Sequence, residues 1–380
     1  MSTISLSGLS DFLLPIDTMR LSGDEGFRQT QLGKHILANE GELPDLDDVD
    51  LILVGCGDSR GAFGAKIDDE TPNAVREQFY RLYQWHEDVK VADLGNIKSG
   101  LTMQDTYAAL TAVLKEIIPS GKKVVVLGGS HDLTTAQYDA YASLEKIIEA
   151  VCVDARIDVD MDSPLPIDNF LLPMFTREPN FLKQYNHIGF QSYMVHPGML
   201  QTIDKLGFDC FRVGKVKENM EEMEPIIRAS DMMSFDIAAI EHAHAPANTF
   251  TPNGFNGEES CLLLQYAGLS SHISTIGIYG YKQEEDHHEM TAKQISHMLW
   301  YLMDGIHQSK EEQPISQSEH FNHFHLCFAE MDSTFLQSRV TGRWWMEVPS
   351  SGYIPCSKND YIQAANNEIP ERWFRAVERS

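Results

Sequence analysis

The chain has 380 residues, of which 42% are hydrophobic and 9% aromatic, and its formal net charge is −26. This content is typical of a folded globular protein with a sizeable core, and it excludes a chain that is disordered throughout. The 56 acidic residues outnumber the 30 basic ones, which disfavours nucleic acid and anionic membranes as partners. We interpret the acidity as a contribution to solubility.

Six cysteines occur in the sequence, and none of them belongs to a CxxC pair. Several lie inside apolar runs, as buried free thiols do, and this favours a reducing compartment. The N-terminus lacks a basic segment followed by a long apolar core, and no apolar run is long enough to span a bilayer. We therefore expect a cytoplasmic protein without a membrane partner.

Apolar runs and helical spacings alternate along most of the chain. Residues 1–48 are mixed in composition and predict a peripheral lead-in with short helices. The alternation over residues 49–310 predicts an α/β domain of three layers, α-β-α, around a mostly parallel central sheet. The predicted strands are 51–55, 89–92, 123–127, 148–153, 187–190, 210–213, 232–237 and 275–279, and the main predicted helices are 72–85, 102–118, 131–144, 220–230, 258–269 and 292–307.

The character of the sequence changes after Glu312. Residues 320–332 alternate between polar and apolar side chains, in the manner of a strand. We expect residues 311–380 to form a C-terminal extension, an extra strand or hairpin packed on the main domain. A separate domain of about 70 residues is the alternative, although that size is marginal for independent folding.

Three predicted strands end in side chains that bind hard metal ions. His131 follows one apolar strand, and Asp236 ends another. Asp154 and Asp158 follow a third. Right-handed crossovers place the carboxyl ends of parallel strands along one edge of the sheet, so we expect these four side chains to meet there. One imidazole and three carboxylates suit manganese or a similar divalent ion.

Around these residues the sequence resembles the arginase–agmatinase–formimidoylglutamase (ureohydrolase) family. Residues 128–132 (GGSHD) are similar to the family's GGDHS, residues 154–158 (DARID) to DAHxD, and residues 234–238 (SFDIA) to the start of SFDxDxxDP. The Gly-rich stretch 55–66 and the segment 251–260 (TPNGFNGEES) resemble two further motifs, in the family's order. The resemblance implies an arginase-like fold.

The resemblance also implies a site for two metal ions, but this chain keeps the ligands of only one. The family's ligands for the first ion fall on His131, Asp154, Asp158 and Asp236. The ligands that serve the second ion alone fall on Arg156 and Ala238. A guanidinium stays protonated and a methyl group has no lone pair, so neither side chain binds a cation.

Charge accounting leaves two states of this site open. Three aspartates and Arg156 sum to −2, which one divalent cation cancels. In that state Arg156 replaces part of the second ion's electrostatic role, by bridging Asp154 or Asp236 in a bidentate pair. In the other state no metal binds, and Arg156 ties the carboxylates together as a structural salt-bridge cluster.

The family's substrate-binding glutamate falls on Glu259, which the resemblance implies to hold a guanidinium or amidine, although Glu258 beside it leaves the register open. The alternative is an exposed acid at a helix N-terminus, where the helix dipole favours it. The proton-shuttling histidine of arginases would fall near residues 169–171, and the sequence has no histidine there.

Two functions are compatible with these residues. The first is metal-dependent hydrolysis of a C–N bond in a small cationic amidine or guanidine, as in formimidoylglutamase, with Asp158 and Arg156 as catalytic residues and Glu259 as the substrate's anchor. The second is a catalytically inactive arginase-fold protein that acts as a binding or assembly partner. The resemblance implies trimers or hexamers, and the unusual tail leaves both a homo-oligomer and another protein partner open.

Overall fold

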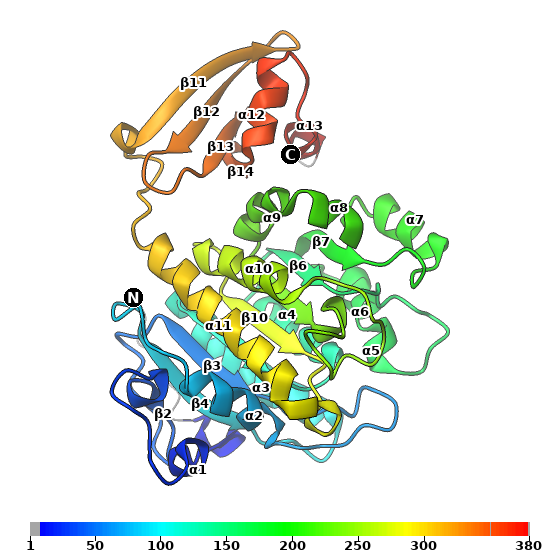
Figure 1. The fold of residues 1–380 in the computed structure, drawn as a ribbon. Coiled ribbons are helices and arrows are strands. Elements are labelled where there is room, and N and C mark those ends of the chain that lie inside the picture. Colours follow the sequence, from blue (N-terminus) through cyan, green and yellow to red (C-terminus); the bar gives the residue numbers. More distant parts are fainter. Residues whose placement is uncertain (1–7, 350, 379–380) are drawn as a thin grey trace.

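A ten-stranded sheet lies between two layers of helices in the described part of the chain (Figure 1). The computed structural model describes residues 8–349 and 351–378. The strands of this sheet are β1 (Leu13–Leu14), β2 (Leu37–Ala38), β3 (Leu51–Gly55), β4 (Val91–Ile97), β5 (Lys123–Leu127), β6 (Ile148–Val153), β7 (Leu182–Phe190), β8 (Asp209–Arg212), β9 (Met232–Asp236) and β10 (Thr275–Tyr279). Their order is β1-β4-β3-β5-β10-β9-β6-β7-β8, with β2 also on β4, and among the described strands of this sheet only β1 runs antiparallel to its neighbour.

Alternate side chains of the central strands pack on opposite helix layers, as expected for a sheet covered on both faces. In β3, Leu51 and Leu53 belong to one buried cluster, and Ile52 and Val54 belong to the other. The first cluster includes side chains of α2 (Thr71–Tyr80), α10 (Gly257–Leu269) and α11 (Met290–Ser309), and the second includes side chains of α3 (Met103–Ile117) and α4 (Thr134–Ser143). This confirms the predicted three-layer α/β class.

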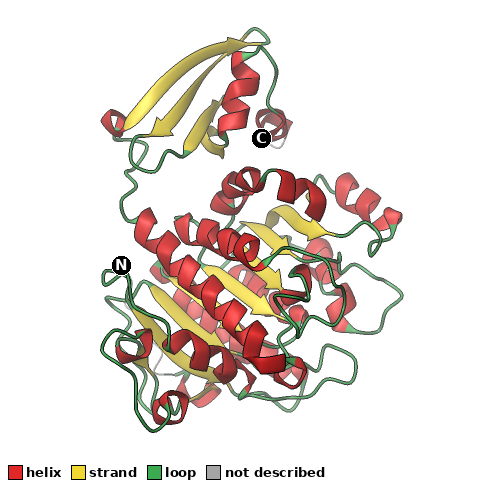
Figure 2. Ribbon diagram, viewed as in Figure 1, coloured by secondary structure: helices red, strands yellow, loops and turns green. Residues whose placement is uncertain are grey.

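The helices of this domain are listed here with their bounds for reference in Figures 1 and 2. They are α1 (Thr18–Ser22), α2 (Thr71–Tyr80), α3 (Met103–Ile117), α4 (Thr134–Ser143), α5 (Pro166–Asn169), α6 (Leu171–Thr176), α7 (Pro197–Lys205), α8 (Val213–Glu218), α9 (Met223–Ala229), α10 (Gly257–Leu269) and α11 (Met290–Ser309). The part of the chain that the structure describes contains no helix long and apolar enough to cross a membrane.

Strand β4 continues to Ile97, beyond the predicted residues 89–92. The prediction stopped short because the second half of the strand contains polar side chains, which the structure buries. Arg76 of α2 lies against β4, with its Nε 2.7 Å from Asp93 Oδ2 and its Nη2 2.9 Å from Asp93 Oδ1. This bidentate pair neutralises a carboxylate that a strand would otherwise not bury. The lead-in also contributes to the sheet, since β1 and β2 both pair with β4.

The C-terminal residues form more than the predicted strand or hairpin. A four-stranded antiparallel sheet consists of β11 (Phe321–Phe328), β12 (Met331–Ser338), β13 (Trp344–Val348) and β14 (Gly352–Cys356), followed by α12 (Lys358–Ala365) and α13 (Glu371–Glu378). We call residues 311–378 the C-terminal lobe (Figure 2). Phe335 and Met346 of the sheet and Trp373 of α13 share a buried cluster of their own, so the helices supply the apolar cover that a lone hairpin lacks.

The lobe contacts the α/β domain through a buried arginine on α9. Arg228 Nη2 donates to the carbonyl oxygen of Trp344 at 2.8 Å, and its guanidinium lies 4.3 Å from the centre of the Trp345 ring. Its Nε lies 2.8 Å from Glu224 Oε1. The side chain of Arg228 is 4% exposed, so the lobe covers a charge that belongs to the domain.

Candidate metal centre

Three carboxylate oxygens surround one ring nitrogen at the carboxyl ends of β5, β6 and β9. His131 Nδ1 lies 3.1 Å from Asp154 Oδ2, 3.4 Å from Asp236 Oδ2 and 3.5 Å from Asp158 Oδ2. The three carboxylates are at most 5% exposed as residues, and His131 is fully buried. The structure therefore brings together the four side chains that the strand-end pattern predicted to meet.

Sheet register explains why these residues meet. Phe235 of β9 pairs with Val153 of β6, so Asp236 and Asp154 follow the same rung of the ladder. Between β9 and β5 lies β10, whose last residue is followed by Gly280. A Cβ at Gly280 would lie 2.6 Å from Asp236 Oδ1, and the residue has a φ of +83°, so only glycine leaves this carboxylate in place.

Two of the three carboxylates are oriented by a hydrogen bond to the second oxygen. Asp154 Oδ1 accepts from the backbone N–H of Arg156 at 3.3 Å, and Asp236 Oδ1 accepts from the backbone N–H of Ala238 at 2.7 Å. Both turns therefore aim Oδ2 at His131. On the far side of the imidazole, Nε2 lies 2.8 Å from Ser234 Oγ, and a ring that donates from Nε2 to this hydroxyl keeps a lone pair on Nδ1 for a cation.

The cluster fits a divalent cation. Ligand atoms about 2.1 Å from one ion and at right angles to each other are about 3 Å apart, close to the separations found here. His131, Asp154 and Asp236 each bring one ligand atom within 4.8 Å of the others, whereas Asp158 lies beside this group. Asp158 Oδ2 is buried and has no hydrogen-bond partner in residues 8–349 and 351–378, as expected of an oxygen that faces a cation.

The pKa shifts reflect crowded charge. Burial raises the pKa of Asp236 to about 6, and the neighbouring Asp154 adds to this effect. Burial opposes protonation of His131, but the adjacent Cys152 sulfur and the close carboxylates of Asp154 and Asp158 raise its pKa well above the ordinary value. Shifted pKa values of this kind cluster at functional sites.

Arg156 does not bridge Asp154 or Asp236, which corrects the expected pairing. Its Nη1 lies 3.0 Å from Asp168 Oδ1, its Nη2 lies 3.6 Å from Asp158 Oδ1, and its guanidinium lies 4.5 Å from the centre of the Phe250 ring. Burial opposes charge on Arg156, but Asp158 and Asp154 raise its pKa.

Glu259 lies at the N-terminus of α10, where it has two contacts. Its Oε2 accepts from the backbone N–H of Asn256 at 2.8 Å, in a capping box, and lies 3.1 Å from Lys217 Nζ. Glu258 points elsewhere, since its Oε2 accepts from the Tyr301 hydroxyl at 3.1 Å. The two acids are thus distinguished, but Glu259 is not brought into the cluster around His131.

Two contributors to the site were not found from the sequence. Asp168 holds Arg156, and it lies in the short helix α5, which was not among the helices that the sequence predicted. His187 of β7 is fully buried, with its Nε2 3.1 Å from the carbonyl oxygen of Asp154, and burial lowers its pKa to about 4. A neutral His187 therefore donates to this carbonyl and supports the strand end. A polar residue inside an apolar strand was the signal for His187.

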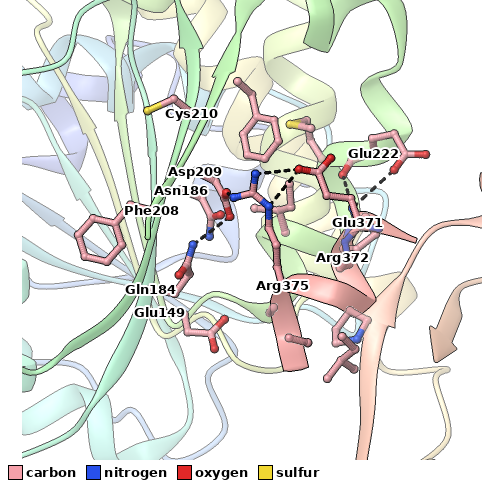
Figure 3. A pocket seen from close by; sticks show the side chains of 18 of the residues that line it. Glu149, Gln184, Asn186, Phe208, Asp209, Cys210, Glu222, Glu371, Arg372 and Arg375 are labelled. Atoms are coloured by element: carbon pink, nitrogen blue, oxygen red, sulfur yellow. Dashed lines mark hydrogen bonds and ion pairs between the residues drawn. The ribbon is translucent and has the colours of Figure 1, made fainter. Parts of the chain in front are cut away.

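A large cavity lies away from this cluster. A space of about 1230 Å³ separates β7 and β8 from the C-terminal lobe (Figure 3), and no residue of the cluster around His131 lines it. Its charged side chains are paired with each other: Arg375 of α13 reaches Asp209 of β8, and Arg372 lies 3.5 Å from Glu222 Oε2. We therefore interpret this cavity as the gap between lobe and domain, and we place the chemistry at the strand ends.

Fold and site define a three-layer α/β protein with a candidate metal centre at the carboxyl ends of its strands. The arginase family model matches residues 50–305, and the chain belongs to that family.

Similar proteins include several formimidoylglutamases. The protein of Staphylococcus epidermidis is 30% identical over 103 residues, which cover 26% of this chain and 32% of that protein. The protein of Vibrio cholerae is 23% identical over 211 residues, which cover 50% and 61%. In both cases this chain spans less than two thirds of the relative's length.

Solved structures share the fold. The formimidoylglutamase of Bacillus subtilis superposes with a TM-score of 0.64 at 15% identity, covering 75% of this chain and 95% of that chain. The formiminoglutamase of Trypanosoma cruzi, solved with Mn²⁺, superposes with a TM-score of 0.62 at 15% identity, covering 69% and 94%.

Proposed function

We propose that this chain is a hydrolase of the C–N bond in a small linear amidine, similar to formimidoylglutamase, and that it uses one divalent cation rather than two. The observation that carries the proposal is the convergence of three carboxylate Oδ2 atoms on His131 Nδ1 at 3.1–3.5 Å. The positions of the second ion's own ligands carry Arg156 and Ala238, which bind no cation.

Manganese is the cation we propose. One imidazole and three carboxylates form a mostly hard donor set, and a relative of the same fold was solved with Mn²⁺. His131, Asp154, Asp158 and Asp236 would hold it. When bound, such a cation supplies the chemistry of lowering the pKa of a water, which makes a nucleophile available at neutral pH.

The chain's own residues supply positioning and charge. Asp158 lies between the cluster and Arg156, so its Oδ2 faces the cation while its Oδ1 faces the guanidinium. We assign to this carboxylate the orientation of the water and the acceptance of its proton. Arg156 keeps a fixed positive charge beside the site, where it stabilises negative charge that develops during attack.

Glu259 is the proposed anchor of the substrate's cationic end. Both of its contacts use Oε2, and the carboxylate is partly exposed. A cationic amidine would compete with Lys217 for this acid. The six cysteines are all free, four of them buried, which suits the cytoplasm as the place of action. We also propose residues 49–310 as the catalytic domain, with residues 1–48 and 311–380 as additions to it.

The test combines metal content with activity. We expect the purified chain to contain one equivalent of manganese and to release formamide from formimidoylglutamate, or urea from a guanidine, in a substrate panel. Asp154→Asn should remove both the ion and the activity. Asp162→Asn is the matched control, since it changes an exposed carboxylate of the same loop.

The second candidate is an inactive protein of the same fold that serves as a binding or assembly partner. The loss of both ligands specific to the second ion favours it, because Arg156 paired with Asp158 and Asp168 also makes a stable metal-free cluster. Absence of metal, together with no release of formamide, urea or ammonia from the panel, would select this candidate and refute the hydrolase.

A further inference from the structure

Four metal-binding side chains meet between α11 and the turn that follows α2. His86 Nε2 lies 2.9 Å from Asp304 Oδ1, and His307 Nδ1 lies 2.7 Å from Asp88 Oδ1. Ligand atoms of His86, Asp88 and His307 all lie within 4.8 Å of one another. None of these residues belongs to the strand-end cluster.

The surrounding contacts hold these side chains in place. Asp304 and His307 are three residues apart on α11, so they share one helix face. The Trp300 indole N–H donates to the carbonyl oxygen of Tyr83 at 3.2 Å, which fixes the turn against the same face. Asp304 Oδ2 accepts from the side-chain amides of Gln265 and Gln308, at 2.5 and 2.6 Å. Its Oδ1 is therefore left toward His86, in the way that outer hydrogen bonds orient metal ligands.

His86 has a ring nitrogen that the protein leaves unsatisfied. Nε2 is excluded from solvent, and no hydrogen-bond partner satisfies it within the described ranges 8–349 and 351–378. The close approach of Asp304 Oδ1 is not aligned as a hydrogen bond. A buried polar atom without a partner costs roughly 1–3 kcal/mol, so its persistence calls for an additional group.

The local charge also leaves room for a cation. Asp88 and Asp50 share one lysine, since Lys310 Nζ lies 3.6 Å from Asp88 Oδ2 and 2.9 Å from Asp50 Oδ1. With Asp304 added, the charges of three carboxylates and one ammonium group sum to −2. A divalent ion cancels this charge, and Lys310 keeps Asp50 as its partner when the ion takes Asp88.

We propose that His86, Asp88, Asp304 and His307 bind one divalent transition-metal ion, of which Zn²⁺ is the best match. Two imidazoles and two carboxylates form a four-ligand set of the kind that zinc takes. The two rings are now stacked, with centres 4.3 Å apart and planes 20° apart, so one ring must turn to face a shared ion. His307 is the ring that turns, because its side chain is 37% exposed against 13% for His86.

The test measures zinc bound per chain, with zinc salt alone as the probe. We expect His86→Gln and His307→Ala each to lower the zinc content by one equivalent, or to weaken that equivalent at least 100-fold in competition with a chelator. The loss should be the same in a background of Asp154→Asn, where the strand-end cluster is disabled. Cobalt in the same background should give the intense visible absorption of a four-coordinate site.

Glu87→Ala is the matched control, because it removes an exposed carboxylate from the same turn. It should leave the zinc content unchanged. Zinc should also raise the melting temperature of the Asp154→Asn protein and have no such effect on the variant that adds His86→Gln, which separates ligand loss from misfolding. An unchanged zinc content in both His86→Gln and His307→Ala would overturn the proposal, whatever the strand-end cluster binds.

Discussion

Arg156 and Ala238 alter the charge of the strand-end cluster in a balanced way. If the site holds one ion, as we propose, two positive charges are lost relative to the family's pattern, while the alanine removes one negative charge and the arginine adds one positive charge. The net change is zero. Arg156 lies 3.6 Å from Asp158, one of the carboxylates that would otherwise repel each other. The two substitutions therefore make sense as a pair.

This balance predicts the result of reversing both changes. We expect the double variant Arg156→His with Ala238→Asp to bind two equivalents of manganese instead of one, because it restores an imidazole and a carboxylate at the second position. Metal analysis after exhaustive dialysis measures the stoichiometry. Ala238→Asp alone should stay at one equivalent, since Arg156 would pair with the new carboxylate. A double variant that still binds one equivalent would contradict the charge argument.

Ser234 is the residue whose removal tests the orientation of His131. Its Oγ lies 2.8 Å from His131 Nε2, on the side away from the carboxylates. Ser234→Ala should weaken metal binding about 10- to 100-fold, because the imidazole loses the contact that fixes its tautomer. Competition with a chelator measures this change. Ser271→Ala, in an exposed loop, should leave the affinity unchanged.

At the scale of elements, strands made mostly of apolar residues could be predicted to the residue. β3, β5, β6 and β10 begin and end where the sequence indicates. β7 could not, since it includes the buried polar residues Gln184 and Asn186, whose environment is set by segments distant in the sequence. The four proposed ligands followed from strand ends and family motifs. The partner of Arg156 did not, because Asp168 lies in α5, a helix of four residues that is too short to show a periodic pattern.

Lys123, the first residue of β5, leads to a prediction about how the stability of the fold depends on pH. Lys123 is buried, its Nζ donates to the carbonyl oxygens of Ser270 and Ile273, and burial lowers its pKa to about 7. The unfolded chain keeps this proton up to about pH 10.5. Between pH 7 and 10.5 the unfolded state thus binds more protons, so this residue makes the folded state more stable as pH rises, by at most about 1.4 kcal/mol per pH unit.

Denaturant unfolding at several pH values measures this effect. Lys123→Met should remove the rise, so that the difference in unfolding free energy between the variant and the parent changes steadily from pH 7 to 10. Lys115→Met, at an exposed position of α3, should run parallel to the parent protein. A Lys123→Met curve parallel to the parent as well would show that Lys123 is charged when folded.

At the scale of the whole molecule, the C-terminal lobe is the part that the sequence indicated least well. Only β11 shows a clear alternation, and this predicted a strand or hairpin. In β13, Trp344 and Trp345 lie on opposite faces of the sheet. Trp344 belongs to the lobe's own buried cluster, and Trp345 packs against Arg228 of the α/β domain. A face that packs on another part of the chain has no periodic signal of its own.

The contacts of Arg228 predict how much the stability of the whole chain depends on the packing of the lobe against the domain. Arg228→Ala should lower the free energy of unfolding by about 3–5 kcal/mol, because it leaves Glu224 without its cation beneath the lobe. It should also speed proteolysis of the connection around residues 310–320. Thermal unfolding and timed digestion measure the two effects. Arg212→Ala, an exposed arginine of β8, should change neither.

The guanidinium beside Asp158 affects how the proposed enzyme loses its activity when the metal is removed and regains it when metal is added. A chelator removes the metal ion but cannot remove the side chain of Arg156. One of the two positive charges that the second ion would supply therefore stays in the site when the metal is removed. The apo form should therefore keep its shape and its arrangement of carboxylates. We expect inactivation by chelation to follow a single phase, and one equivalent of added metal to bring back full turnover without any cooperative second loading step.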